Sequence, residues 1–471
     1  MYALVGIIGL MISIYMRPYE WNADLSSLPF LQVCCLLALA GLAIDIATRR
    51  TRFISNPMTP FCVFLAFWCI ITLGIAAPDQ LASKWSPIFI SLLLFVLISH
   101  GVQTVQAFTR LVLTIFALGL FVAFIGAEQG TREFGCHIVP PENDHRRPFY
   151  DGRACEPIGD MKQEDAVNLC YQGPGAKNVG YRCEKPGFFN TSSIEGRVRY
   201  LGVLTDPNEL ALATSLALPI AFAFFEMKKS GTRLILLLFG VGLVALEVVY
   251  TKSRGGQIVF GVVLGAYFVR KYGIKRGAII AGAMAVPLIV LGGRSGDSAD
   301  QSAIDRLQAA SAAIHFLMWY PIQGVGYTQF TEHHPLTAHN AYLLSAGELG
   351  LPGLLAFTSM IYLCLKTMVT VLRYDFEEDD AEGAKIKSLA MAMLAVFSGI
   401  GIGIFLLSWT YHFILWIHFG LAGALYAVMR NNYPSFQVRF RFKELMAIFG
   451  VWLCILVAFS FHIWRKGCWA R

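Results

Sequence analysis

Long apolar blocks with almost no charge constrain the fold of this chain more than any other feature. Residues 87–101 (PIFISLLLFVLISHG) and 278–292 (AIIAGAMAVPLIVLG) are two of them. A membrane-spanning helix needs roughly 20 apolar residues, and most of these blocks lack the polar stripe of a soluble helix. The chain is therefore predicted to be an all-α polytopic membrane protein with about 12–13 transmembrane helices, rather than a soluble protein with deeply buried helices.

The predicted spans start near residues 2, 29, 59, 86, 109, 209, 233, 257, 277, 342, 388, 411 and 445. The first block lacks the basic start and the small-residue cleavage site of a signal peptide, so it is interpreted as a retained helix. Only 15% of the residues are charged, against about a quarter in a soluble protein. The net charge of +7 is modest. No basic–aromatic cluster points to nucleic acid, and membrane lipids are the expected surroundings.

The distribution of positive charge predicts which loops lie on which side of the membrane, because short loops rich in Lys and Arg stay in the cytoplasm. Four such loops are TRRTR at 48–52, KKSGTR at 228–233, RKYGIKR at 270–276 and RFRFK at 439–443. With the N-terminus inside, all four are cytoplasmic. Residues 128–208 and 293–341 then form two larger extracytoplasmic loops. The basic tail would lie outside against the rule, so one block is either miscounted or lies on the membrane surface.

Four parts of the chain are expected from these patterns. They are the N-terminal helices 1–127, the polar loop 128–208, a membrane core 209–430 that includes the outer loop 293–341, and a basic segment with the last helix, 431–471.

The polar loop holds four cysteines, Cys136, Cys155, Cys170 and Cys183. Oxidising compartments preserve disulfides, so two disulfides are predicted, with the pairing left open. Zinc binding with His137 and His145 is the alternative. It is disfavoured because structural zinc sites use close Cys-x-x-Cys pairs. The loop is either a cap over a membrane site or a surface feature unrelated to chemistry.

The end of this loop, GRVRYLGVLTDPNELA, leads into the next helix. Asn208 is placed to cap that helix, because its side chain can accept from the first free amides. Binding of a substrate is the alternative role. Arg197 and Arg199 precede it at the membrane surface, where they either contact an anionic head group or are ordinary interfacial residues.

A short outer turn, residues 250–260 (YTKSRGGQIVF), carries positive charge on the side where the topology rule disfavours it. Arg254 offers a planar fork of donors suited to phosphate oxygens. The adjacent Gly255 and Gly256 allow a close approach of the backbone to a ligand. Arg254 is therefore predicted to bind an anion, with a snorkelling role as the alternative.

The second larger outer loop contains an amphipathic pattern over residues 303–319, with Arg306 near its start, and then a Gly-Val-Gly turn. His333, His334 and His339 follow. Their spacing is not a zinc signature, so no metal is expected. His339 and Asn340 directly precede an apolar helix. A neutral imidazole near pH 7 can take a proton from a hydroxyl, so His339 is predicted to be a general base. A helix-capping role is the alternative.

These motifs together resemble the bacterial O-antigen ligase and O-antigen polymerase superfamily. The resemblance rests on His339-Asn340 followed by Gly350 and Gly353, on DPNELA at 206–211, on KSRGG at 252–256, and on DRLQAA followed by PIQGVGYTQF. It covers roughly residues 196–430. The cysteine-bearing insertion departs from the usual pattern, in which that connection is short.

The resemblance implies a glycosyltransferase of the bacterial inner membrane that acts at the periplasmic face. The donor would be an undecaprenyl-diphosphate-linked glycan and the acceptor a hydroxyl of lipid A-core or another molecule, with no metal or other cofactor. By motif match, His339 would be the catalytic histidine, and Arg254 and Arg306 the essential arginines, with Arg199, Asn208 and Asn340 as further candidates. A repeat-unit polymerase, a protein O-oligosaccharyltransferase and a transporter remain alternatives, although the sequence lacks the internal repeat typical of transporters.

Glu348 lies inside an apolar block, where a carboxylate is costly unless it is paired or protonated. It is about two and a half helical turns from His339, on roughly the opposite face. Glu348 is therefore expected to bond a neighbouring helix, with Tyr or Trp of residues 408–416 as partners. Gly347, Gly350 and Gly353 form a small-residue seam suited to close helix packing.

Overall fold

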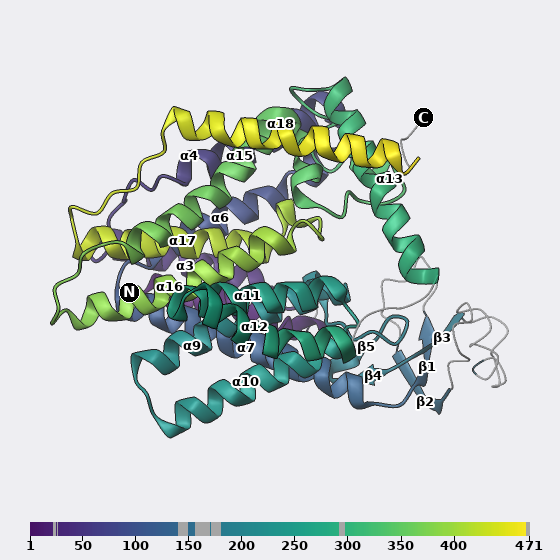
Figure 1. Ribbon diagram of the computed structural model, residues 1–471, viewed down its shortest axis with the longest axis horizontal. Coiled ribbons are helices and arrows are strands. Elements are labelled where there is room, and N and C mark those ends of the chain that lie inside the picture. Colours follow the sequence, from purple (N-terminus) through teal and green to yellow (C-terminus); the bar gives the residue numbers. More distant parts are fainter. Residues whose placement is uncertain are drawn as a thin grey trace.

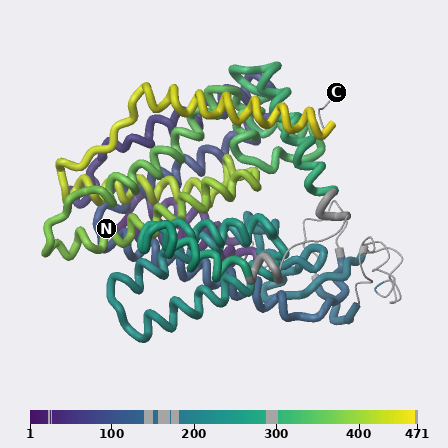
Figure 2. The backbone as a smooth tube through the Cα atoms, viewed as in Figure 1, coloured from purple at the N-terminus to yellow at the C-terminus, as the bar shows by residue number. Residues whose placement is uncertain are grey.

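A bundle of long helices makes up most of the molecule in the computed structural model, which describes residues 1–21, 25, 27–139, 149–155, 170, 180–291 and 297–467. Figures 1 and 2 show the helices running side by side, with a small β-region at one end. The helices before the long loop are α1 (Ala3–Tyr15), α3 (Phe30–Ala47), α4 (Thr59–Ala76), α5 (Leu81–Lys84), α6 (Ser86–Gly101) and α7 (Val105–Thr131).

The helices after the loop are α8 (Pro207–Ser215), α9 (Leu218–Met227), α10 (Gly231–Tyr250), α11 (Arg254–Tyr272), α12 (Ile274–Leu291), α13 (Asp297–Trp319), α14 (Phe330–His333), α15 (Ala341–Leu372), α16 (Ala381–Gly403), α17 (Phe413–Asn432) and α18 (Phe442–Arg465). The short 3-10 helices are η1 (Pro18–Glu20), η2 (Pro78–Gln80), η5 (Phe188–Asn190), η6 (Gly202–Leu204) and η7 (Trp409–Tyr411).

Ten helical segments in the described residues are long and apolar enough to cross a membrane. An eleventh is obtained if the pair Pro78–Lys84 and Ser86–Gly101, bent by 45°, counts as one span. The prediction of a polytopic helical membrane protein is confirmed, but this count is lower than the 12–13 expected. Helices α11 and α12 occupy the two remaining predicted blocks. Basic residues at one or both ends of these helices, such as Arg254 and Arg270, shorten their apolar stretches.

The polar loop forms two small antiparallel sheets. Strands β2 (Phe149–Ala154), β1 (Gly135–Val139) and β3 (Gly180–Glu184) make one sheet in that order, and β4 (Pro186–Gly187) pairs with β5 (Thr191–Ser192). The strands lie at the same end of the bundle as the last turn of α18 (Figure 1).

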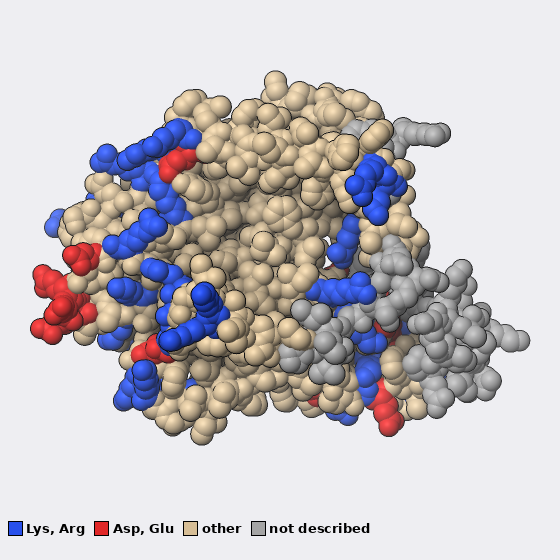
Figure 3. All heavy atoms as spheres, viewed as in Figure 1, with Lys and Arg blue, Asp and Glu red and all other residues tan. Residues whose placement is uncertain are grey.

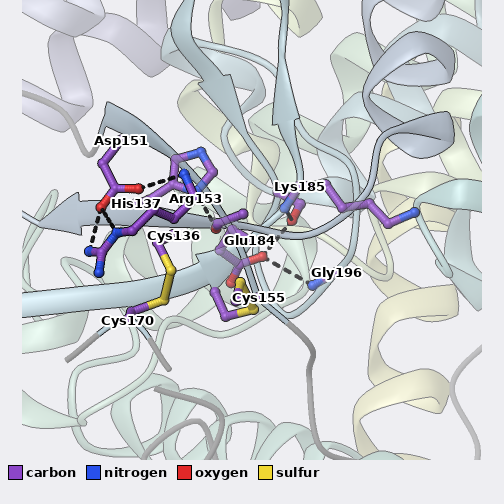
Figure 4. The surroundings of a disulfide bond; sticks show 12 residues. Cys136, His137, Asp151, Arg153, Cys155, Cys170, Glu184, Lys185 and Gly196 are labelled. Carbon is purple, nitrogen blue, oxygen red and sulfur yellow. Dashed lines mark hydrogen bonds and ion pairs between the residues drawn. A yellow bond between two sulfur atoms is a disulfide. The ribbon is translucent and has the colours of Figure 1, made fainter. Parts of the chain in front are cut away.

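Two disulfides join the loop, Cys136–Cys170 and Cys155–Cys183 (Figure 4). The predicted disulfides are thus confirmed and their pairing is settled. Three of these sulfur atoms lie within 4.8 Å of one another, because the two disulfides are neighbours, and disulfide bonding removes the thiolates that zinc would need. The Nδ1 atom of His137 lies 3.0 Å from the carbonyl of Gly135. His145 lies outside the described residues.

The returning end of the loop is tied to the membrane helices. The Glu184 carboxylate accepts from the backbone N–H groups of Glu195 (2.7 Å) and Gly196 (3.1 Å), as Figure 4 shows in part. The Lys185 ammonium donates to the carbonyl of Gly130 at the end of α7, at 2.6 Å. The first two bonds close the loop on itself, and the third holds it against the end of α7.

Helix α15 is broken in its first third, at Gly350 (φ 66°, ψ −165°). The segment that precedes α15 in the sequence lies at the break and donates hydrogen bonds to its free carbonyls. Val325 N–H donates to the carbonyl of Gly347 and Gly326 N–H to that of Glu348, both at 2.9 Å. A membrane interior has no water to satisfy the backbone groups of a broken helix, so this segment supplies the missing partners.

The glycines near the break lie against different parts of the chain. A Cβ atom at Gly350 would lie 2.2 Å from the carbonyl oxygen of Ile322, whereas one at Gly347 would approach Ala313 of α13 at 3.3 Å. The predicted seam therefore packs against a helix at Gly347 and against the turn that follows α13 at Gly350. The Glu348 carboxylate accepts from the Phe330 N–H at 3.1 Å, and Tyr411 of the 408–416 segment is an electrostatic neighbour of it.

Candidate functional site

A pocket of about 330 Å³ opens at the end of the bundle that carries the β-region. Its lining residues come from four segments that are far apart in sequence: Arg197, Asp206, Asn208, Lys252, Arg254, Gly255, Ser302, Ala303, Arg306 and His339. Of the six candidate site residues named from the sequence, the pocket brings together four, namely His339, Arg254, Arg306 and Asn208. Arg199 and Asn340 are not part of the lining.

Asn208 connects the first two segments. Its Oδ1 atom accepts from the Ser253 hydroxyl at 2.6 Å and from Arg197 Nη2 at 3.2 Å. Arg197 Nε also donates to the carbonyl of Thr251, at 2.9 Å. Arg197 is buried, so its guanidinium is held where it lines the pocket. Two roles were open for Arg197 from the sequence, contact with an anionic head group or an ordinary interfacial position, because nothing local showed that the segment folds back onto the 250–256 turn.

The expectation that Asn208 caps α8 is wrong. Asp206 is the N-cap residue, and its Oδ1 atom accepts from the Asn208 N–H at 2.6 Å and from Asn208 Nδ2 at 2.8 Å. The reason is Pro207, which occupies the first helical position. Proline is favoured there, which places the cap one residue before it. The Asn208 side chain is consequently available to join the segments of the site.

The turn that presents Arg254 is fixed by a helix cap. The Ser253 hydroxyl accepts from the Gly256 N–H at 2.9 Å and caps α11. A Cβ atom at Gly256 would lie 2.3 Å from the Cβ of Ala211, so the glycine allows α8 and α11 to approach closely. Arg254 is the first residue of α11 and is exposed at the pocket mouth.

His339 lies in the left-handed region of backbone conformation (φ 47°), and so does Lys252 (φ 49°). Such conformations are costly for non-glycine residues and cluster at functional sites. Asn340, directly after His339, is the N-cap of α15 and accepts from the N–H groups of Tyr342 and Leu343, each at 3.0 Å. The capping role considered for His339 thus falls to Asn340, while His339 lines the pocket.

Arg199 does not line the pocket, and its hydrogen bonds hold the polar loop in place. Its Nε atom donates to the carbonyl of Ser192 at 2.9 Å, and its backbone N–H donates to Gln129 Oε1 at 3.0 Å. Ser192 belongs to the polar loop and Gln129 to the end of α7, so Arg199 helps to hold the loop against α7.

The electrostatics of the pocket favour anions and a neutral imidazole. Burial and the positive charge of Arg306 lower the pKa of His339, and the carboxylates of Asp206 and Asp305 oppose this only in part. A lowered pKa leaves His339 unprotonated near pH 7, where it can accept a proton. The basic side chains that line the pocket outnumber its one carboxylate, Asp206. Such an arrangement can bind phosphate oxygens and deprotonate a hydroxyl.

The fold and the pocket define a class: a multi-pass helical membrane protein with a basic, histidine-containing pocket at one end of its bundle. Comparison with known families narrows this class, since residues 239–358 match the family model described as O-antigen ligase. The match includes Arg254, Arg306 and His339. The resemblance to the O-antigen ligase superfamily is therefore confirmed, and it supports a membrane glycosyltransferase of that type. No curated protein matches the chain.

Proposed function

We propose that the protein transfers a glycan from an undecaprenyl diphosphate carrier to an acceptor hydroxyl, at the periplasmic face of the inner membrane. The main support is the convergence of His339, Arg254 and Arg306 in one pocket. The family match supports the reaction class. The loop disulfides and the basic loops at the opposite end support an outer location, because disulfides persist outside the cytoplasm.

In the proposed reaction, His339 takes the proton of the acceptor hydroxyl as the oxygen attacks the anomeric carbon. The bond between that carbon and the diphosphate oxygen breaks, and the lipid diphosphate leaves with the bonding electron pair. General-base assistance contributes on the order of 10²–10⁴ in rate. Attack from the face opposite the leaving group inverts the anomeric centre.

The arginines stabilise the leaving group. Arg254 and Arg306 reach the pocket from different helices, so their guanidinium groups can bind separate oxygens of one diphosphate bidentately. Loss of one preorganised donor of this kind costs roughly 10²–10³ in rate. Arg197 and Lys252 add positive charge from the loop side.

The decisive test is transfer in vitro from a purified lipid-diphosphate glycan to candidate acceptors, including lipid A-core. His339→Ala is expected to abolish transfer while the variant keeps its melting temperature. His334→Ala is the matched control, because His334 is near the same end but does not line the pocket. Substantial transfer by folded His339→Ala protein would show that His339 is not the base.

A second pair of variants tests the role of the guanidinium fork. Arg254→Lys is expected to lower the rate about 10²-fold, because a point charge cannot replace two parallel donors. Arg276→Lys, an exposed position at the other end of the bundle, should retain the wild-type rate. Near-normal transfer by Arg254→Lys would remove the bidentate contact from the mechanism.

A further inference from the structure

A second basic pocket, of about 420 Å³, lies at the end of the bundle opposite the candidate active site. Three arginines line it: Arg52 from the loop between α3 and α4, Arg430 from the last turn of α17, and Arg439 just before α18. Helix α17 runs between the two pockets. At its start, the Nε2 atom of His412 lies 2.9 Å from the carbonyl oxygen of Val203, near the first pocket. At its end, Arg430 lines the second pocket. Figure 3 shows Lys and Arg side chains over this end, together with a cluster of Asp and Glu side chains at its edge.

All three guanidinium groups are held by neutral acceptors. Arg52 Nε donates to Asn431 Oδ1 at 3.1 Å, and Arg439 Nη2 to Gln437 Oε1 at 2.9 Å. Arg430 Nη1 donates to the carbonyl of Phe436 at 2.9 Å and also to that of Pro434. Within the described part of the chain, no carboxylate forms an ion pair with any of the three. Three positive charges thus face one hollow without an internal counter-charge.

The walls of this pocket are cross-linked and therefore preorganised. Gln103 accepts from the Arg52 N–H at 3.2 Å and donates to its carbonyl at 2.6 Å. Asn431 Nδ2 donates in turn to the carbonyl of Gln103 at 3.1 Å. The Lys366 ammonium donates to the carbonyl of Arg439 at 2.6 Å. Four separate segments of the chain are consequently fixed around the arginines before any ligand arrives.

Apolar side chains beside the arginines indicate where the ligand comes from. Phe53 lines the pocket and is 70% exposed, and Phe442, three residues beyond Arg439, is 75% exposed. Exposed aromatic rings next to guanidinium groups fit the boundary between head groups and acyl chains. Basic pockets between transmembrane helices at the cytoplasmic face bind phosphate-bearing head groups.

We propose that Arg52, Arg430 and Arg439 bind the phosphate group of an anionic phospholipid at the cytoplasmic face. The site is separate from glycan transfer and requires no part of that proposal. Guanidinium groups bind phosphate oxygens bidentately, and the lipid phosphate would supply the ion-pair partner that the described carboxylates do not give these three arginines. The acyl chains would extend along the exposed face near Phe53 and Phe442.

Native mass spectrometry of the full-length protein, released from nanodiscs of phosphatidylcholine with a minority of phosphatidylglycerol or cardiolipin, tests this site. The wild type should retain the anionic lipid. Arg52→Gln and Arg439→Gln should each lower the retained fraction roughly fivefold, and the double variant more. Both positions are exposed, so the variants should fold, which melting temperature verifies. Arg276→Gln, a charge removed from the same end outside the pocket, should behave like wild type.

Competition with inorganic phosphate at millimolar concentration distinguishes a lipid phosphate from a soluble phosphate as the ligand. If it fails to displace the lipid, the lipid assignment is supported. If it displaces the lipid from wild type and also stabilises wild type but not the double variant, the arginines bind phosphate but the natural ligand is a soluble anion, and the lipid assignment is wrong. Equal lipid retention by the double variant and Arg276→Gln would overturn the site itself.

Discussion

His339 combines two properties at the scale of a single residue: a strained backbone and a lowered pKa. The positive φ angle costs on the order of 1–3 kcal/mol, and Asn340 offsets part of this by capping α15 immediately afterwards. Because Arg306 is one of the causes of the lowered pKa, the group proposed to bind the leaving diphosphate also keeps the proposed base unprotonated.

This coupling predicts the pH dependence of the rate. A general base works in its neutral form, so transfer by the wild type should decline only below the ordinary histidine pKa of about 6.5. Removing a neighbouring cation favours the protonated form and raises the pKa of His339. Arg306→Gln should therefore shift the acid limb of the kcat/KM profile to higher pH, besides lowering the rate.

Arg306→Lys is the control for that shift, since it retains the charge and should leave the acid limb in place while it lowers the rate. An acid limb that stays unchanged in Arg306→Gln would mean that His339 is not the group whose titration limits transfer.

Sequence patterns predicted individual site residues only where the chemistry is local. Arg254 stands out because its charge breaks the topology rule, and His339 because it directly precedes an apolar helix, whereas Arg306 became a candidate only through its match to the family motif. The roles of Asn208 and Arg197 depend on contacts with the 250–256 turn. No periodicity within residues 196–208 contains that information, so sequence reasoning assigned Asn208 to a cap that Asp206 provides.

At the scale of elements, hydropathy placed a helix at every predicted block but could not show the break in α15. The apolar run continues through Gly350 and Pro352, so it reads as one span. The break is visible only with the loop in place, because Val325, Gly326 and Leu351 form the hydrogen bonds that satisfy it. The small sheets of the polar loop were missed because their strands are short, two to six residues, and carry no clear alternation of apolar and polar residues.

The break makes Gly350 a position that should tolerate no side chain. Its backbone conformation is accessible essentially to glycine alone, and an added methyl group would meet the Ile322 carbonyl at 2.2 Å. Gly350→Ala should lower the free energy of unfolding by at least about 1–3 kcal/mol, measured by thermal unfolding in nanodiscs.

Gly242→Ala in α10 is the matched control, because an added Cβ there meets nothing within 4 Å. Replacing glycine by alanine inside an open helix face stabilises by up to about 1 kcal/mol. The two substitutions should therefore have opposite signs. An unaltered melting temperature in Gly350→Ala would show that the helix is continuous at this point.

At the scale of the whole molecule, the two ends of the bundle differ in chemistry. One end carries the disulfide-linked loop and the histidine pocket, and the other carries the basic loops and the arginine pocket. The charge rule predicted this polarity. The same threading places the basic C-terminal tail outside, against the charge rule. Figure 1 shows the end of α18 at the end of the bundle that carries the β-strands, as that threading requires.

This polarity predicts the redox state of the loop in protein isolated from membranes. Proteolysis without reduction should yield linked peptides containing Cys136 with Cys170 and Cys155 with Cys183, and reduction should separate them. Buried thiols such as Cys62 and Cys364 should react with maleimide only after denaturation. Free thiols at the four loop positions in native membranes would place this end of the bundle in the reducing cytoplasm.

The filled break in α15 also has a consequence for biogenesis. The segment that satisfies the carbonyls of Gly347 and Glu348 precedes the helix in the chain, and so does Trp68, which donates to the Leu349 carbonyl at 2.8 Å. The ribosome therefore completes every partner of the break before the helix itself emerges. The translocation machinery can release this discontinuous span directly into its docking site, and its unpaired carbonyls need never face lipid.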